Sequence, residues 1–398
     1  MTGTAAIRRI AALLTLAAAP AAAGAQVDFE QCVAALRATA EERGVTPQTA
    51  ETVTARVRQL PRVIESDRNQ PEFVDTFASY LNRRVTAARV ETGRELLRRH
   101  RSQLDSIARE FGVAPQYLVA FWGLETSYGR VLGDVPVFDS LATLACDTRR
   151  AGYFTTEFVN ALHIVDRGVD ASSMIGSWAG AMGHTQFMPS VYLEHAVDGD
   201  GDGDVDLWSS VEDAFASAAS FLRSLGWRPG WRWGREVLLP EDFDYYAAGR
   251  DRPRPLEEWR QLGVMTTAGR PIEPADEEAA LLLPSGSDGP AFLVYANFHA
   301  IMRWNRSEFF ALTVGHLADR IAGAGPLHTP PPNAPRLTRE HVKALQVKLN
   351  ELGYDAGEPD GIVGSATRSA VRAWQRSQGL AADGYVDADL LRGMNVLD

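Results

Sequence analysis

Apolar residues recur at helical spacing over most of the first half of the chain. From about 29 to 225 they fall three or four positions apart, as in the run Phe73, Val74, Phe77, Tyr80 and Leu81. This is the period of an α-helix that buries one face. Strand-like alternation of apolar and polar positions is scarce in the same stretch, so the pattern predicts a mainly α-helical region.

The pattern changes between about 227 and 292. Proline, glycine and aromatic residues become more frequent, and short apolar runs appear at 236–239 and 280–283. Such runs, bounded by turn residues, are typical of short strands. We expect a small β-containing insertion at 227–292 and helices again at 298–321, so the predicted fold class is mainly α (α+β).

A stretch rich in proline and glycine, 323–336, follows this large domain at 26–322. Its composition predicts an extended, semi-rigid linker rather than a packed segment. The remaining residues, 337–398, are numerous enough to fold alone. Within them, two runs predict amphipathic helices: Val342, Leu345, Leu349 and Leu352, and Ala366, Ala370, Val371 and Trp374.

The N-terminus has the features of an export signal. Arg8 and Arg9 precede an apolar run at 10–19, which is too short to span a bilayer as a helix. Ala23-Gly24-Ala25 then matches a small-x-small cleavage site. We expect 1–25 to be a signal peptide cleaved near Ala25, and the protein to be periplasmic. Without a cysteine at that site, or a later membrane span, no membrane anchor is expected.

Composition narrows the classes of partner. The chain has 398 residues, 45% hydrophobic and 23% charged, which is ordinary for a soluble globular protein. The net charge is -11, whereas nucleic-acid-binding proteins usually have a basic surface. This acidic balance also does not suggest binding to anionic lipid. We expect a monomer. Export would allow Cys32 and Cys146 to pair, but two separate buried thiols fit equally well, because the sequence gives no distance between them.

A carboxylate on an apolar helical face is the first candidate for chemistry. In the run 115–129, Leu118, Trp122 and Glu125 share one face, with Pro115 at the helix start and Gly129 as its C-cap. Burial and the negative end of the helix dipole would both raise the pKa of Glu125. A protonated acid near neutral pH suits donation to a glycosidic oxygen. The alternative is a carboxylate on the helix rim, paired with Arg130 or solvated.

The second candidate is a glycine-rich run at 176–190. Its glycines at 176, 180 and 183 permit close backbone approach, and the Gln186 amide can both donate to and accept from sugar hydroxyl or acetamido groups. The alternative is a glycine-rich turn that only packs helices tightly.

An acidic loop predicts a calcium site. Asp198, Asp200 and Asp202 stand at positions 1, 3 and 5 of an EF-hand-like loop, with Gly203 at position 6 and Asp204 next. The usual twelfth position holds Ser209, so we expect a longer loop that Glu212 completes. The ion, Ca²⁺, is expected to be structural; the alternative is a solvated acidic turn. No organic cofactor is expected, and the sequence holds no HExxH, phosphate-loop or GxSxG signature.

The fourth run, 295–307, combines aromatic and amide side chains, including Tyr295, Asn297 and Trp304. These residue types suit a sugar-binding groove. The alternative is a core strand leading into a helix, and for Phe298 we favour that interpretation.

These four elements, in this order, resemble the membrane-bound lytic transglycosylase B family, whose members are lysozyme-like murein-cleaving enzymes. The resemblance spans roughly 28–322. It implies that Glu125 is catalytic, that Ser177, Gln186 and Asn297 line the saccharide site, and that the calcium loop ends at Glu212. Its residues are Gly123-Leu-Glu125-Thr-Ser-Tyr-Gly129, Ala179-Gly-Ala-Met-Gly183, Gln186-Phe-Met-Pro-Ser190, Asn297-Phe298 and Arg303-Trp-Asn305.

The sequence departs from that family at two places. His184-Thr185 stands where a Tyr-Gly pair is common, and Trp304 stands where a tyrosine is common. Contacts with individual sugars near these residues are therefore the least defined part of the predicted site.

The C-terminal segment, about 337–394, resembles the small three-helix peptidoglycan-binding domain found at the ends of many wall hydrolases. The resemblance implies that this module tethers the enzyme to the wall. Its residues include Val342-Lys-Ala-Leu-Gln-Val-Lys-Leu349, Leu352-Gly-Tyr354, Asp360-Gly-Ile-Val-Gly364, Ala370-Val371, Trp374-Gln375 and Asp383-Gly384.

The expected function is lytic cleavage of the β-1,4 bond between N-acetylmuramic acid and N-acetylglucosamine, with a 1,6-anhydromuramoyl product. Glu125 would serve as the single acid and base, and peptidoglycan glycan strands as the substrate. A hydrolytic muramidase is the nearest alternative, and it would need a second acid such as Asp134, Asp139 or Asp147. A non-catalytic peptidoglycan-binding protein and a calcium-dependent adhesin are the alternatives from other classes.

Overall fold

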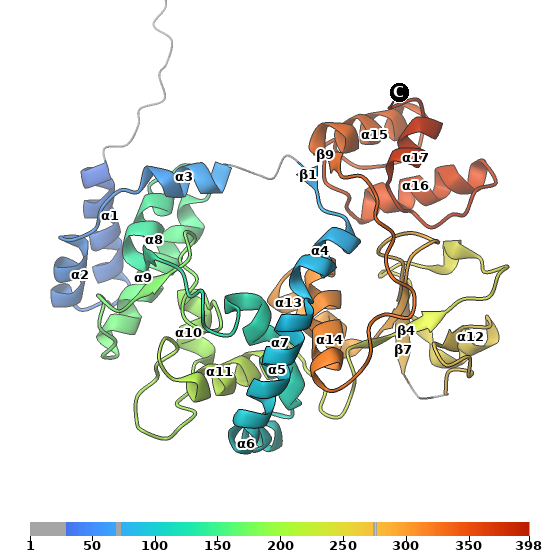
Figure 1. Cartoon of the computed structure of the whole chain (residues 1–398). Helices are drawn as coiled ribbons and strands as arrows, with labels where there is room; N and C mark the ends of the chain where they lie inside the picture. The colour runs from blue at the N-terminus through green and yellow to red at the C-terminus, as the bar shows by residue number, and fades with distance from the viewer. Residues whose placement is uncertain (1–28, 69–72, 274, 276, 398) are drawn as a thin grey trace, which may run out of the picture.

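The computed structural model describes residues 29–68, 73–273, 275 and 277–397. The predicted signal peptide lies outside this range. The described chain is mostly helical, with a small sheet and a separate C-terminal module (Figure 1). No helix among the described residues is long and apolar enough to cross a membrane.

A first lobe of helices packs around its own apolar core. A disulfide between Cys32 and Cys146 joins the first helix to the C-cap of α8, so the two cysteines are paired rather than separate. The helices of this lobe are α1 (Phe29–Glu42), α2 (Pro47–Thr54), α3 (Pro61–Arg68), α8 (Val137–Ala145), α9 (Ala151–Asp166) and α10 (Pro189–His195).

A second group of helices surrounds α7 (Pro115–Thr126), whose side chains are buried on nearly all sides. A helix that is apolar all round belongs inside a protein, and α14, α5, α6 and α11 pack against it. The members around α7 are α4 (Phe77–Arg84), α5 (Ala87–Arg99), α6 (Arg101–Phe111), α11 (Val211–Ser224), α13 (Ala296–Trp304) and α14 (Glu308–Ile321).

The insertion is a five-stranded antiparallel sheet with the order β5-β7-β8-β4-β6. The central strands are apolar on both faces because one face joins the core around α7 and the other packs on helix α12. The predicted strands at 236–239 and 280–283 are thus present. The elements are β4 (Gly234–Leu238), β5 (Arg254–Pro255), α12 (Leu256–Gln261), β6 (Met265–Thr266), β7 (Glu278–Leu282) and β8 (Ala291–Val294).

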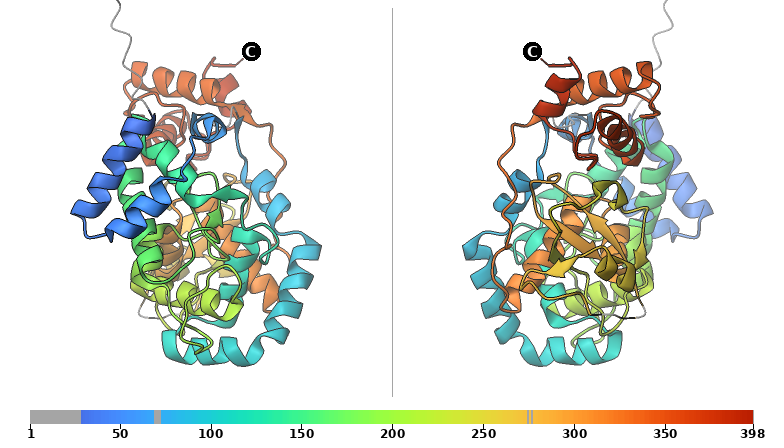
Figure 2. Two further views of the ribbon diagram at one scale, coloured as in Figure 1. Left: turned by 90° about the vertical axis from the view of Figure 1, so that its left-hand side faces the viewer. Right: turned by 90° about the vertical axis from the view of Figure 1, so that its right-hand side faces the viewer.

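The C-terminal module consists of α15 (Arg339–Glu351), α16 (Ser365–Ser377) and α17 (Ala388–Gly393) around a small core of its own. It lies above the sheet when the molecule is viewed from the sheet side (Figure 2, right). Strand β9 (Leu337–Thr338) starts the module and pairs with β1 (Phe73–Val74), which precedes α4. The module is therefore docked on the large domain.

Three local predictions differ from the structure. Phe73 and Val74 form strand β1 rather than a helical turn, because β9 supplies a partner strand from the far end of the chain. The helix expected at 298–321 is divided at 305–307. The linker is extended but not free of packing, since the backbone N–H groups of His328 and Thr329 both donate to the Glu236 carboxylate.

Candidate active site

Helix α7 presents Glu125 in its last turn. Pro115 begins the helix as predicted, but the helix ends at Thr126, and Ser127 rather than Gly129 is the C-cap. Ser127, Tyr128 and Gly129 have positive φ angles of 52°, 63° and 77°. Consecutive left-handed residues are uncommon outside glycine and persist only where the surroundings hold them.

Hydrogen bonds hold this strained turn in place. The Tyr128 hydroxyl donates to the Arg89 carbonyl at 2.7 Å, and the Thr126 hydroxyl donates to the His184 carbonyl at 3.1 Å. The indole N–H of Trp122 donates to Nδ1 of His184 at 3.0 Å, so that the His184 ring carries its proton on Nε2. The end of α7 is thereby fixed to the glycine-rich run.

Glu125 is half-buried, and its carboxyl borders a small space lined mainly by apolar side chains such as Leu118 and Phe215. Burial raises the pKa of Glu125 to about 7, and the Trp304 hydrogen bond partly opposes this. In that bond the indole Nε1 donates to Oε1 at 2.9 Å. The group can therefore carry a proton near neutral pH.

The alternative of a rim carboxylate does not fit this structure. Arg130 donates to the Ser127 carbonyl and forms no ion pair with Glu125 among the described residues. Of the other acids considered, Asp139 accepts the Arg58 backbone N–H and Asp147 pairs with Arg68. No described carboxylate contributes to the raised pKa of Glu125.

The glycine-rich run folds back beside the end of α7. Strand β2 (Val135–Pro136) pairs with β3 (Ile175–Gly176), and Met182 bridges both Gly176 and Phe187. A Cβ at Gly176 would lie 2.1 Å from the Ala181 carbonyl oxygen, so only glycine fits there. Ser177 and Gln186 both lie on this chain reversal.

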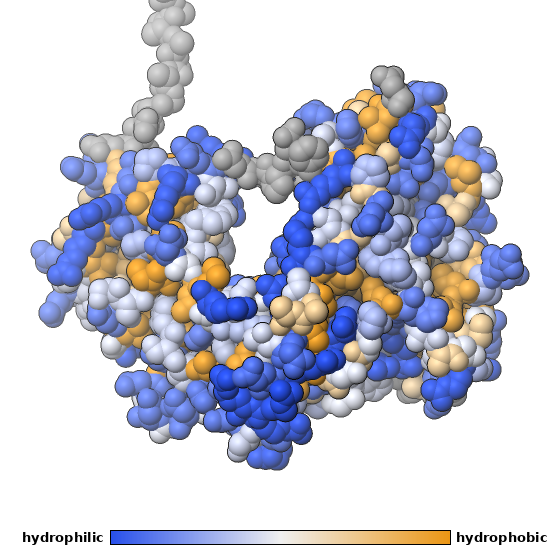
Figure 3. Space-filling model, in the orientation of Figure 1, coloured by the Kyte–Doolittle hydropathy of each residue, from blue (hydrophilic) through white to orange (hydrophobic). Residues whose placement is uncertain are grey.

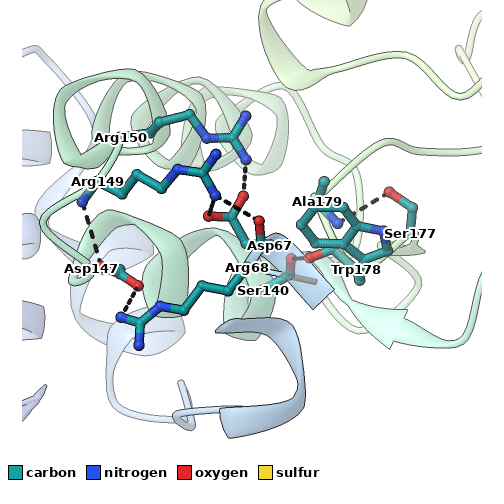
Figure 4. Close-up of polar contacts among 9 residues, drawn as sticks. All are labelled: Asp67, Arg68, Ser140, Asp147, Arg149, Arg150, Ser177, Trp178 and Ala179. Atoms are coloured by element: carbon teal, nitrogen blue, oxygen red, sulfur yellow. Dashed lines mark hydrogen bonds and ion pairs between the residues drawn. The ribbon is translucent and has the colours of Figure 1, made fainter. Parts of the chain in front are cut away.

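The side chains of Ser177 and Gln186 mainly hold the backbone of the reversal. The Ser177 hydroxyl accepts the N–H groups of Ala179 and Ala181, and the former bond is drawn in Figure 4. Gln186 has a positive φ of 52°, and its amide nitrogen donates to the carbonyls of Leu132 and Gly183. Both residues are half-buried, so each keeps some surface for a ligand.

An ion-pair cluster anchors the first lobe beside this run. Asp67 on α3 is almost fully buried and pairs with both Arg149 and Arg150, while Arg68 pairs with Asp147 (Figure 4). These three ion pairs join α3 to the segment between α8 and α9. The space-filling view shows a hollow between this lobe and the segment of β1 and α4 (Figure 3).

Two predicted sugar contacts do not fit their surroundings. Asn297 is fully buried, and its amide accepts from the Arg228 N–H and donates to the carbonyls of Arg228 and Trp231. Tyr295 is also buried and belongs to the core on the α12 side of the sheet. Both residues hold the fold, as Phe298 does, whereas Trp304 reaches Glu125.

The acidic loop gathers three of its predicted ligands. Asp198, Asp200 and Asp202 each offer an oxygen within 4.8 Å of the others, and all three are exposed. Hard oxygen donors in this arrangement are those that Ca²⁺ takes. Glu212 lies instead within reach of Gln103 and His100, and Asp204 does not join the cluster of three.

The first comparison with known proteins concerns the large domain. Residues 28–319 match the family model described as Transglycosylase SLT domain. The chain belongs to this transglycosylase family. It is a lytic transglycosylase that acts on peptidoglycan, and residues 338–394 match a second model, Putative peptidoglycan binding domain.

Relatives cover different parts of this transglycosylase. Membrane-bound lytic murein transglycosylase B of Escherichia coli is 32% identical over 250 residues, which are 61% of this chain and 66% of the relative. The crystal structure of SltB3 from Pseudomonas aeruginosa in complex with NAG-anhNAM-pentapeptide is 42% identical with a TM-score of 0.89, covering 93% of this chain and all of that one. The Escherichia coli lytic transglycosylase Slt35 in complex with calcium is 28% identical, with a TM-score of 0.63, covering 73% and 92%.

The structure adds Tyr80 to the residues near Glu125. The charge of Glu125 contributes to raising the pKa of Tyr80, after burial as the largest cause, so the two side chains are neighbours. The guanidinium of Arg84 lies 3.7 Å from the centre of the Tyr80 ring. In the sequence Tyr80 is one member of an apolar stripe, and nothing in its spacing distinguishes it from core residues.

Proposed function

We propose that Glu125 is the single acid and base with which this transglycosylase cleaves the bond between N-acetylmuramic acid and N-acetylglucosamine. The observation that carries the proposal is the enclosed Glu125 carboxyl, whose pKa is raised to about 7. A catalytic acid works best when its pKa lies near the operating pH. The absence of a neighbouring carboxylate among the described residues favours one acid over the usual pair.

The proposed reaction has two proton transfers at one carboxyl group. Glu125 first donates its proton to the glycosidic oxygen, and the bond to the muramoyl C1 breaks with an oxocarbenium-like transition state. The C6 hydroxyl of the same sugar then attacks C1 and gives its proton to Glu125. The product is a 1,6-anhydromuramoyl end, and no water is consumed. The SltB3 relative, solved with NAG-anhNAM-pentapeptide, supports a product of this type.

Three further residues are proposed to position the sugar. Ser177 and Gln186 lie on the chain reversal beside the end of α7 and remain half-buried. Trp304 donates to Glu125 and packs against Phe121, with 4.5 Å between ring centres. This indole limits how far the ionised carboxylate is destabilised and gives the site an aromatic wall.

A structural calcium ion is proposed for the acidic loop. Its support is the cluster of Asp198, Asp200 and Asp202 and the calcium complex of the Slt35 relative. Calorimetric titration with Ca²⁺ would test it: Asp200→Asn should weaken binding at least tenfold. Glu212→Ala decides whether the loop is extended, because unchanged affinity would remove Glu212 from the ligands.

Export and tethering complete the proposal. We propose that 1–25 are a signal peptide, that the enzyme works in the periplasm as a monomer, and that the module at 337–398 holds it on the wall. The match of 338–394 to the peptidoglycan-binding model supports the tether. A tethered enzyme meets its substrate at a high effective concentration.

Mass spectrometry of sugars released from purified peptidoglycan tests the mechanism. The mature enzyme should release anhydromuramoyl products, Glu125→Gln should release none, and Asp134→Asn should behave as the wild type. Products heavier by one water, together with inactivity of Asp134→Asn, would make the enzyme a hydrolase with two acids. No release by the wild type at any pH would favour a binding protein.

A further inference from the structure

A cavity of about 700 Å³ lies where the C-terminal module meets the large domain. Its walls come from α16, from the loop that follows β7, and from the segment between α13 and α14. In Figure 1 this region lies between the C-terminal helices and the sheet. Its volume is in the range of sites that bind small ligands, and the transglycosylase mechanism above does not use it.

Arg372 on α16 is the unusual residue of this cavity. It lines the cavity but is only 5% exposed, and its Nε has no hydrogen-bond partner among the described residues. No described carboxylate forms an ion pair with it. Burial, followed by the positive charge of Arg252, lowers its pKa. An arginine nevertheless stays charged in proteins, and a buried charge without a partner is costly.

The acids that line the cavity have other partners. Glu308 pairs with Arg368 at 3.9 Å, and Asp75 pairs with Arg336 at 3.2 Å. Asp383 accepts the Ser287 N–H and the Gln375 amide. These contacts also dock the module on the large domain.

Two further acids, Asp387 and Asp251, line the cavity. Asp387 caps α17 by accepting the Leu390 N–H. Asp251 is exposed, and its charge acts on Arg372 from beyond ion-pair distance. Arg306, which also lines the cavity, has no acceptor within hydrogen-bonding distance among the described residues. The cavity therefore presents two arginines, Arg372 and Arg306, whose donors are not matched by protein acceptors, which suits a carboxylate ligand.

The chain connects this cavity to the catalytic centre. Trp304 donates to Glu125, and Arg306, two residues later, lines the cavity. Two residues span at most about 7 Å of backbone. A group attached to the sugar whose glycosidic oxygen Glu125 protonates would therefore have the cavity on its Arg306 side, near the start of α14.

We propose that this cavity binds a free carboxylate of a peptidoglycan stem peptide, with Arg372 as the anchoring group and Arg306 at its catalytic side. The inference rests on the proposed function and extends it, because stem peptides are joined to the muramoyl sugars of the strand being cut. It predicts that the C-terminal module and the large domain bind the peptide together, and that the module is more than a separate tether.

Calorimetry on the full-length Glu125→Gln protein tests the site without turnover. The probes are a synthetic stem pentapeptide with free carboxylates and the same peptide with every carboxylate amidated. The free peptide should bind, and amidation should weaken binding at least tenfold. Adding Arg372→Gln should weaken binding of the free peptide to a similar extent, and Arg372→Lys should restore part of it.

Arg376→Gln is the matched control. Arg376 lies one turn further along α16 and stacks on Tyr246 across the same interface, 4.6 Å from the ring centre, but it does not line the cavity. This variant should bind the free peptide as the parent does. Equal binding of free and amidated peptides, or unchanged binding by Arg372→Gln, would overturn the proposal and make Arg372 a solvated interface residue.

Activity measurements separate this inference from the proposed function. In the protein with Glu125 intact, Arg372→Gln should raise KM for stem-bearing strands several-fold and leave cleavage of strands stripped of peptide unchanged. Equal loss on both substrates would indicate a structural defect and overturn the peptide site. Absence of anhydro products from the wild type would instead overturn the proposed function, while the peptide titration would still report on the cavity.

Discussion

At the scale of single residues, the protonation of Glu125 governs the expected chemistry. Its pKa of about 7 reflects burial, with the Trp304 hydrogen bond acting in the opposite direction. The acid must be protonated to donate, so kcat/KM should fall as pH rises through about 7. Trp304→Phe keeps an aromatic ring but removes the donor to the carboxylate, so the alkaline limb of the pH profile should move to higher pH. A limb that stays in place would contradict the assignment.

The same pKa predicts an effect on stability. The folded-state pKa of Glu125 lies above its ordinary value of 4.5. The folded protein therefore holds this proton more tightly, and the associated stability is complete below pH 4.5 and lost as pH rises through 7. Glu125→Gln is neutral at every pH. Its unfolding free energy relative to that of the wild type should therefore be roughly 1–3 kcal/mol higher at pH 8 than at pH 5. Urea unfolding of both proteins at pH 5 and at pH 8 measures this difference.

The exposed Glu110 provides the control for that measurement. Glu110→Gln removes an acid from α6 without changing a buried group. Its stability relative to the wild type should change little between the two pH values. A similar gain in both variants would assign the effect to net charge rather than to burial of Glu125.

At the scale of elements, the disulfide is the covalent support of the first lobe. Cys32 on α1 and Cys146 after α8 are 114 residues apart, and closing a long loop restricts the unfolded chain. The double variant Cys32→Ser/Cys146→Ser should lose about 2–5 kcal/mol of stability. Thermal unfolding of the oxidised wild type, the reduced wild type and the variant would check this; equal melting temperatures would show that the bond contributes nothing.

Secondary structure was predictable where the pattern was local. Helix α7 starts at Pro115, and its Leu118-Trp122-Glu125 face points inward, as periodicity requires. The end of α7 was misplaced because three residues adopt positive φ, which only their tertiary hydrogen bonds support. The burial of Asn297 was not predictable, because an amide in an aromatic run suits a sugar site and buried hydrogen bonds to the backbone equally well.

At the scale of the whole molecule, the docked module predicts a difference between substrates. Removing 323–398 takes away the peptidoglycan-binding match and β9, the partner of β1. The truncated enzyme should bind insoluble peptidoglycan roughly 10²-fold more weakly, because the tether is lost. Cleavage of short strands stripped of peptide should change far less. Sedimentation with sacculi and kinetics on soluble strands measure the two effects, and equal losses would argue against tethering.

The sequence by itself determined which residues can do the chemistry and which stretches form helices. Both are local properties: periodicity put Glu125 on an apolar face, and motif spacing identified the family, the acidic loop and the C-terminal module. Only the tertiary structure decided what lies next to Glu125, how the cysteines pair, and how the module docks. Those features join segments far apart in the chain, such as Trp304 with Glu125 and β9 with β1, and contact between distant segments depends on packing that local spacing does not encode.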